Sequence, residues 1–303
     1  MISRTTRVER RNLEDDFSIL YHTRSLQSTI EWLIHNKLVL TDQTCPSCDG
    51  FKMRHVKDNS KADQLKLRCS KCLTTKTFRW NSIFEDHKLT LMELCQIMFH
   101  YFPKNTSIKE TEKHLPAQFK SISNIYAKLR TIISEYMESL KIGKKLGVTG
   151  PVEIDETLMT HHNGDQMWVL SIFDRVTKEL WCYSLPDRTS GTLIPIITEA
   201  VAPGALVYTD GWSSYNSLTE EGFEHRVVLH VNGFGSGTET TNGIESCWSE
   251  LKRLTKYYQG IQVDENDPLN NLLEYVNVGV WRRQNKNADL IQELIDIINM
   301  FYF

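Results

Sequence analysis

The sequence predicts an α/β protein in which a mixed β-sheet flanked by helices occupies the second half of the chain. Short runs of Val, Ile, Leu and Tyr bounded by Gly or Pro predict strands at residues 152–159, 167–174, 180–185, 205–209 and 226–230. Helical patterns at 191–201 and 213–221 fall between the later strands. Strands that are followed by an alternation of strands and helices indicate a sheet with helices packed on it.

Three acidic residues on these elements form the candidate catalytic centre. Asp155 lies on the first predicted strand, Asp210 ends the fourth, and Glu245 lies in the first turn of a predicted helix. Mg²⁺ and Mn²⁺ prefer oxygen ligands, and two such ions can activate the attacking oxygen and stabilise the leaving oxygen at phosphorus. An isolated Asp at a strand end is usually a turn residue, but three acids on these elements favour a metal site. We therefore expect a ribonuclease-H-like catalytic domain at residues 152–285, with the first and fourth strands adjacent.

The charge of the chain is divided unequally between its two halves. Residues 1–150 carry 25 Lys and Arg against 16 Asp and Glu, whereas residues 151–303 carry 10 against 22. A basic front half predicts contact with nucleic acid, although surface charge can also be partitioned by chance. No apolar run approaches the length of a membrane span, and the polar start MISRTTRVERR lacks the apolar segment of a signal peptide. We expect a protein that is not secreted: nuclear in a eukaryote, otherwise cytoplasmic.

Two cysteine pairs predict a zinc ribbon at residues 41–80, after an N-terminal helical segment at 1–40 with a helix near 25–37. The pairs stand in CPSC and CSKC, with 20 residues between them, and supply Cys45, Cys48, Cys69 and Cys72. Four thiolates from two tight turns complete a tetrahedral structural Zn²⁺ site. Disulfides are disfavoured in a reducing compartment, and a redox role for one CxxC motif does not explain two.

Basic and aromatic residues interleave in the ribbon and the helices that follow, which is a pattern suited to phosphate contact. Residues 89–102 predict a core helix, and the helices expected near 107–114 and 121–137 form a helix-turn-helix-like segment within residues 89–140. A solvated basic face is the competing interpretation, and most helix pairs bind no DNA. The candidate DNA contacts here are Lys71, Lys76, Arg79, Lys120, Asn124 and Lys128.

The remaining segments connect or follow these domains. Residues 141–151 are rich in Gly and Lys and predict a linker, whereas residues 286–303 predict a C-terminal helix. The Gly-rich loop at 232–241 is expected to become ordered on DNA or metal. Lys252 and Arg253 follow Glu245 on its helix and are further candidate phosphate contacts.

The blocks VEIDET, VYTDGWSSY and NGIESCWSELKR resemble the catalytic blocks of Merlin-type DDE transposases and their bacterial insertion-sequence relatives, and the resemblance covers roughly residues 40–280. It implies a catalytic triad of Asp155, Asp210 and Glu245 that holds two Mg²⁺ or Mn²⁺ ions. Some relatives use Asn as the third residue, and Asn242 lies one turn before Glu245.

The resemblance also implies an activity and a partner. A transposase of this kind binds the terminal inverted repeats of double-stranded DNA, cuts there and joins the freed ends to target DNA, acting as a homo-oligomer of at least two chains. Two alternatives remain open from the sequence: a domesticated, non-catalytic zinc-ribbon DNA-binding protein, and a metal-dependent nuclease of resolvase-like or ribonuclease-like type.

Overall fold

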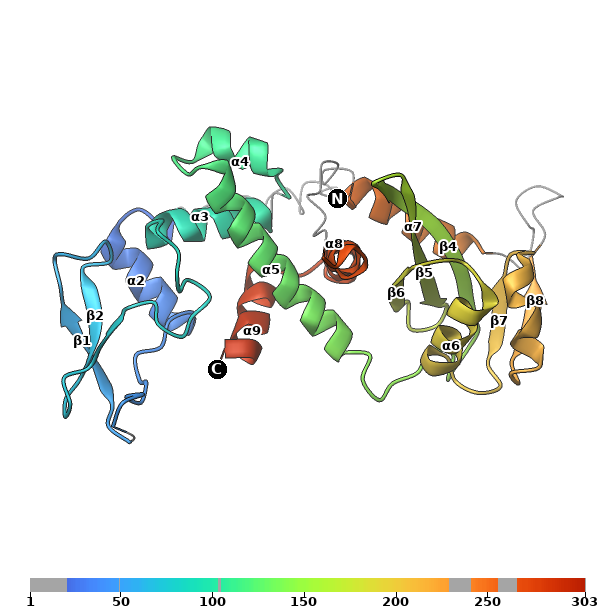
Figure 1. Cartoon of the computed structure of the whole chain (residues 1–303), viewed down its shortest axis with the longest axis horizontal. Coiled ribbons are helices and arrows are strands. Elements are labelled where there is room, and N and C mark those ends of the chain that lie inside the picture. The colour runs from blue at the N-terminus through green and yellow to red at the C-terminus, as the bar shows by residue number, and fades with distance from the viewer. Residues whose placement is uncertain (1–20, 49, 103–104, 229–240, 256–265, 303) are drawn as a thin grey trace, which may run out of the picture. The chain divides into compact units, whose positions relative to one another are not determined.

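The computed structural model describes residues 21–48, 50–102, 105–228, 241–255 and 266–302, and the chain divides into two units (Figure 1). The first unit comprises Met1–Ile132 with Asn287–Phe303, and the second comprises Ile133–Lys286. No helix among the described residues is long and apolar enough to cross a membrane.

The first unit combines a small three-stranded sheet with helices. Its antiparallel strands are β1 (Met53–Lys57), β2 (Leu65–Cys69) and β3 (Thr75–Thr77), in the order β1-β2-β3. Its helices are α2 (Leu26–His35), α3 (Leu91–Tyr101), α4 (Ile108–His114), most of α5 (Phe119–Ser139) and α9 (Leu290–Tyr302). The Asn299 side chain on α9 donates to the Asn36 carbonyl at 3.0 Å, so the C-terminal helix is tied to the end of α2.

Capping residues explain where these helices start. Ser25 and Thr90 each form a reciprocal capping box, at α2 and α3. Ser107 accepts from the Glu110 N–H at 3.2 Å and so caps the start of α4. The side-chain oxygens satisfy N–H groups that the first helical turn leaves without partners.

The second unit is built on a five-stranded mixed sheet of order β6-β5-β4-β7-β8. The strands are β4 (Val152–His162), β5 (Asp165–Asp174), β6 (Leu180–Leu185), β7 (Leu206–Thr209) and β8 (Glu224–Val227). β4, β5 and β6 pair antiparallel, whereas β7 is parallel to β4 and β8 is parallel to β7. The predicted mixed sheet is therefore confirmed, with the first and fourth strands adjacent.

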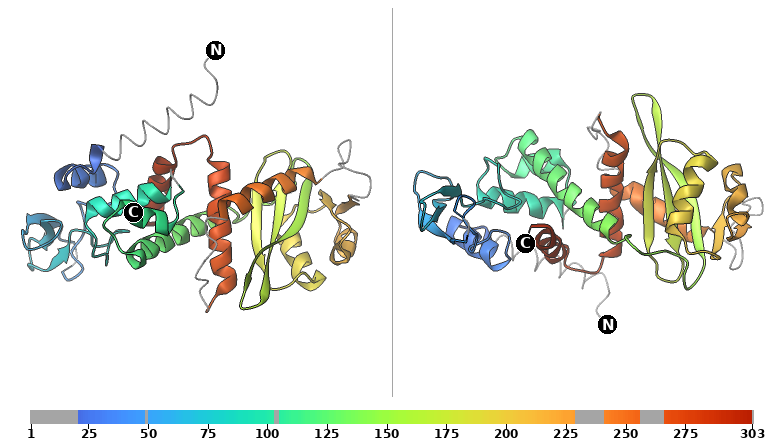
Figure 2. Two further views of the ribbon diagram at one scale, coloured as in Figure 1. Left: turned by 90° about the horizontal axis from the view of Figure 1, so that it is seen from above. Right: turned by 60° about the horizontal axis from the view of Figure 1, so that its bottom comes forward.

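Helices cover both faces of this sheet. They are α6 (Ser190–Ala200), the 3-10 helix η1 (Ser213–Thr219), α7 (Asn242–Thr255) and α8 (Pro268–Gln284). In the right-hand view of Figure 2, the yellow α6 and the red-orange α8 lie on opposite sides of the strands. Val152 and Ile154 of β4 join the apolar core that includes α6 residues, so alternation turns Glu153 and Asp155 toward the face that α7 covers.

Two segments differ from the sequence-based expectation. Residues 213–219 form a 3-10 helix rather than an α-helix, and α8 was not predicted. The presumed linker at 141–151 is attached to the end of α6: Leu146 exchanges backbone hydrogen bonds with Ala200 and Ala202, at 2.9 and 2.8 Å. The Lys145 ammonium also donates to the Thr198 and Glu199 carbonyls, as a cation at a helix C-terminus commonly does.

Candidate active site and metal centre

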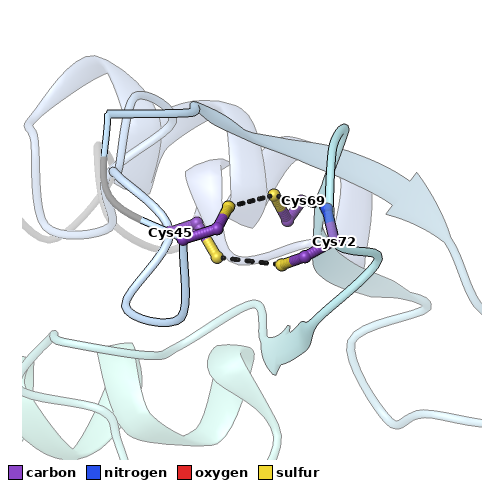
Figure 3. Close-up of side chains that lie close together, drawn as sticks. Cys45, Cys69 and Cys72 are labelled. Carbon is purple, nitrogen blue, oxygen red and sulfur yellow. Dashed lines mark hydrogen bonds between the residues drawn. The ribbon is translucent and has the colours of Figure 1, made fainter.

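The four predicted zinc ligands come together in the first unit. Their sulfur atoms all lie within 4.8 Å of one another (Figure 3). The Cys45 and Cys72 sulfurs are 3.5 Å apart, and so are those of Cys48 and Cys69. Cys45 and Cys69 are also buried, in a small core that includes Met53. Because four sulfurs leave no open position, this donor set fits a structural zinc ion.

The local backbone favours the thiolate form of two of these cysteines. The N–H groups of Cys72 and Lys71 donate to the Cys69 sulfur at 3.5 and 3.3 Å and lower the pKa of that thiol. Contacts with the side chain and the backbone of Thr74 lower the pKa of Cys72 to about 6. The thiolate is the form that ligates a metal, so the turn around Cys69 and Cys72 is prepared for a cation.

Arg79 is a correction to the predicted DNA contacts. Its side chain is buried, and it forms an ion pair with Asp63 through hydrogen bonds of 2.6 and 2.5 Å. It also donates to the His87 and Leu89 carbonyls, at 2.9 and 2.6 Å. The guanidinium is thus used to hold the end of the ribbon against the segment that follows. Lys71 is exposed beside the Phe51 ring, and Lys76 is half-buried beside Trp80.

The helix pair displays two of its three predicted DNA contacts to solvent. α4 and α5 are joined by residues 115–118, and Lys120 and Asn124 are exposed on α5. Lys128 is half-buried, and burial lowers its pKa while the charges of Asp86 and Glu85 oppose that shift. The Lys128 ammonium is therefore only partly exposed to solvent.

Two of the candidate catalytic acids lie side by side in the second unit. In the parallel pair β4–β7, Val152 stands opposite Val207 and Glu153 opposite Tyr208. The same offset, continued along the chain, places Asp210 beside Asp155. Asp210 follows the last residue of β7, and its carboxylate accepts the Trp212 N–H at 3.0 Å, which closes the turn after the strand.

The proximity of these carboxylates is visible in the pKa of Asp155. Burial raises that pKa to about 7, and the negative charges of Asp210 and Glu156 add to the rise. α7 packs against β4 on this side of the sheet, where the Ile244 N–H donates to Glu153. Two carboxylates held together in a partly buried place repel each other, and a divalent cation would relieve that repulsion.

Glu245 lies in the first turn of α7, three residues before Trp248, and is half-buried, whereas Asn242 is exposed. Among the described residues, the four cysteines form the one group of three or more His, Cys, Asp or Glu side chains placed to share a single metal ion.

Glu153, which the sequence reading did not single out, attaches α7 to the sheet. It is buried on β4, where it accepts from the Arg175 guanidinium at 2.6 Å and from the Ile244 N–H at 2.8 Å. Gly243 is necessary for this approach, because a Cβ there would lie 2.6 Å from the Phe173 ring and 2.9 Å from the Glu153 carboxylate. A charged residue at a buried strand position and a Gly at a helix start were the available sequence signals.

Glu156 faces the other side of the sheet, as strand alternation predicts. Its carboxylate accepts from the Tyr215 hydroxyl and lies 3.5 Å from the Arg188 guanidinium. That guanidinium lies 4.1 Å from the ring centre of Trp168 and 4.4 Å from that of Trp212. These contacts give Glu156 a structural role behind the two aspartates.

The other predicted site residues are exposed or lie outside the described ranges. Lys252 and Arg253 are exposed in the last turn of α7. Of the Gly-rich loop at 232–241, only Thr241 belongs to the described residues.

A zinc measurement tests the cysteine cluster. We expect one Zn²⁺ per chain by elemental analysis of the purified protein, and loss of that zinc in Cys69→Ser, because serine supplies no thiolate. Cys95→Ser is the matched control, since Cys95 is buried in α3, outside the cluster. Full zinc content in Cys69→Ser would show that the cluster is not the zinc site.

The raised pKa of Asp155 predicts a pH dependence of stability without divalent cations. Because this pKa is about 7 rather than 3.8, the folded state binds more protons between these values, and stability falls as pH rises through that window. We expect the free energy of unfolding of the unsubstituted protein to fall by on the order of 2–4 kcal/mol between about pH 4 and about pH 7. The Asp155→Asn variant should not show this fall. Mg²⁺ should raise the melting temperature more at about pH 8 than at about pH 5.

Asp187→Asn is the control for this titration. The Thr192 and Thr189 hydroxyls and the Thr189 N–H lower the pKa of Asp187, so its stabilisation is complete above the unfolded value and is lost only at lower pH. Around neutral pH, the stability of Asp187→Asn should therefore change with pH as steeply as that of the unsubstituted protein. An unchanged slope in Asp155→Asn would contradict the raised pKa of Asp155.

Gly243→Ala tests the attachment of α7. The added methyl group meets Phe173 and Glu153, so we expect a destabilisation of about 1–3 kcal/mol and faster hydrogen exchange in α7. Gly191→Ala is matched to it, because the nearest atom to a Cβ at this α6 position is 3.8 Å away. The control should be neutral or slightly stabilising. Equal effects of the two substitutions would mean that α7 does not need the close approach.

The fold and these sites can be compared with known proteins. Residues 147–283 match the family model of the ISXO2-like transposase domain, and the matched segment contains Asp155, Asp210 and Glu245. A transposase-like protein of Haemophilus influenzae is 34% identical over 101 residues, which is 33% of this chain and 77% of that protein. A protein in transposable element ISH50 of Halobacterium salinarum is 23% identical over 269 residues, covering 80% of this chain and 88% of its own length.

Among solved structures, a chain of the simian T-cell lymphotropic virus intasome in complex with PP2A regulatory subunit B56 gamma is similar over 62% of this chain and 67% of its own. Its sequence identity is 14% and its TM-score is 0.32. The family match and the Haemophilus relative together show that this chain belongs to the insertion-sequence transposases with an ISXO2-like transposase domain.

Proposed function

We propose that this chain is an active DNA transposase, with a ribonuclease-H-like catalytic domain that cleaves DNA strands at the ends of its element and joins them to target DNA. One observation carries the proposal: the parallel β4–β7 register sets Asp155 beside Asp210 within the segment that matches the transposase family model. The closer relationship to Merlin-type elements rests on the sequence blocks around the three acids.

Asp155, Asp210 and Glu245 are the residues that would hold the catalytic ions. Mg²⁺ or Mn²⁺, when bound, would supply an activated attacking oxygen and stabilisation of the leaving oxygen. The chain's own contribution is position: the two aspartates come from neighbouring strands, and Glu245 comes from a helix that Glu153 attaches to the same sheet. Rigid elements hold ligands more accurately than loops do.

DNA recognition belongs, in this proposal, to the front of the chain. The zinc ribbon at 41–80 and the helix pair within 89–140 would bind the double-stranded terminal inverted repeats through exposed residues such as Lys71, Lys120 and Asn124. Lys252 and Arg253 are exposed on α7 and would contact phosphates near the catalytic centre. Because two element ends must be joined together, the working form would contain at least two chains.

The three acids acting as one site give the central test. Asp155→Ala, Asp210→Ala and Glu245→Ala should each lower Mg²⁺- or Mn²⁺-dependent strand cleavage and joining by roughly 10³-fold or more, because ligands that act together lose function together. Binding to the terminal repeats, measured by fluorescence anisotropy, should persist, since it is assigned to the front of the chain.

Two controls separate the possible explanations. Asn242→Ala should retain activity, because Asn242 is exposed and Glu245 is the half-buried acid of the first turn. Glu220→Ala removes an exposed acid from the same unit and should also be neutral. If Asn242→Ala abolished joining while Glu245→Ala did not, the third ligand would be Asn242. An unsubstituted protein that binds the repeats but cuts nothing under these conditions would favour the non-catalytic DNA-binding alternative.

A further inference from the structure

The second unit contains a basic cleft that no part of the proposed catalytic centre uses. This cavity has a volume of about 630 Å³, and it is lined by the end of α5, the turn between β5 and β6, and the end of α8. The basic side chains in its lining, which together define the basic cleft, are Lys141, Lys144, Lys178, Arg283 and Lys286.

The concentration of positive charge here runs against the composition of this half of the chain. Residues 151–303 hold 10 basic residues against 22 acidic ones, yet Lys178, Arg283 and Lys286 are three of those ten. Among the described residues that line the cleft, Glu179 is the only acid. A local excess of cations in an otherwise acidic region indicates a site for an anionic ligand.

Two of the five cations already have partners and form the walls. The Lys141 ammonium donates to Glu138 at 2.8 Å and to the Cys182 carbonyl at 2.9 Å, and its side chain is largely buried. Glu138 also accepts from the Asn277 amide at 2.8 Å, so its negative charge is compensated within the protein. The Arg283 guanidinium lies 3.2 Å from Glu250.

The other three cations remain available to a ligand, and of these the Lys178 ammonium also lies 5.7 Å from the centre of the Phe173 ring. Lys144, Lys178 and Lys286 are exposed, and none forms an ion pair with a residue in the described part of the chain. An exposed lysine is ordinarily only a solvated charge, but these three come from separate elements and face one cavity. Three ammonium groups around one open cleft can contact successive phosphates of a strand.

Lys178 is held in place by its turn. Its φ of 63° lies in the left-handed region, where Gly or Asn is usual and a long side chain costs conformational energy. The Asp174 side chain accepts the Val176 and Thr177 N–H groups at 2.8 and 2.9 Å, and the Asp174 carbonyl accepts the Lys178 N–H at 3.0 Å. The turn therefore presents Lys178 from a fixed backbone.

We infer that the basic cleft binds the sugar–phosphate backbone of DNA, as a second contact surface on the catalytic unit that is separate from the zinc ribbon and the helix pair. This inference rests on the proposed function, because it supplies a site for DNA that the enzyme must already hold. Backbone contact carries no sequence information, so the cleft adds affinity and position rather than recognition of a particular sequence.

The test uses the full-length protein and a fluorescein-labelled DNA duplex of mixed sequence, with affinity measured over a series of salt concentrations. The variant Lys144→Glu/Lys178→Glu/Lys286→Glu should bind at least about 10-fold more weakly, and its log–log salt slope should be shallower by about 2–3, because each lost phosphate contact removes about 0.9. Lys144→Arg/Lys178→Arg/Lys286→Arg keeps the charges and should retain the affinity and the salt slope of the unsubstituted protein. Zinc content and circular dichroism verify that both proteins are folded.

The outcomes separate this inference from the proposed function. If the unsubstituted protein binds the duplex and the glutamate variant matches it in affinity and salt slope, the basic cleft does not contact DNA and the inference is wrong. An equal loss in the arginine variant would also overturn it, because charge is then not what the cleft supplies. If the unsubstituted protein does not bind the duplex at all, the proposed function itself fails.

Discussion

The buried carboxylate of Glu153 is the contact on which the candidate active site depends. It sits on β4 two residues before Asp155, where it accepts from Arg175 and from the first turn of α7. A buried carboxylate without partners is costly by several kcal/mol. The free energy that keeps the Glu153 carboxylate, Arg175 and the first turn of α7 together is therefore substantial. Since Glu245 is carried by the same turn of α7, the contact that satisfies Glu153 also decides where the third acid lies.

The two faces of β4 have different roles. Val152 and Ile154 of β4 are completely buried in the apolar core, whereas the residues that alternate with them are acidic. One face of β4 thus contributes to folding through burial of apolar surface, and the other face gathers negative charge. The raised pKa of Asp155 is the consequence of that arrangement, and a cation bound there would offset the repulsion between the carboxylates.

The zinc ribbon lacks a large apolar core. Its three short strands bury few large side chains, and a sheet of this size has little core of its own. Zinc held by the four clustered sulfurs would supply the stability that this core does not. Arg79 pairs with Asp63 inside the ribbon and donates to the His87 and Leu89 carbonyls, so it joins the ribbon to the segment that follows and is unavailable to DNA.

By itself, the sequence predicted most of the elements, although not α8, and it supplied the candidate site residues. Local spacing was sufficient for the five strands, the capped helices and the four cysteines, because hydrophobic period, capping and ligand spacing are encoded over a few residues. Alternation along β4 also accounts for Asp155 and Glu156 facing opposite sides of the sheet. The tertiary structure decided which side chains meet. The β4–β7 register, the attachment of α7 through Glu153, the burial of Arg79 and the gathering of lysines from three elements all involve residues distant in the chain. No local pattern reports such contacts, because they arise only when the sheet and its helices pack.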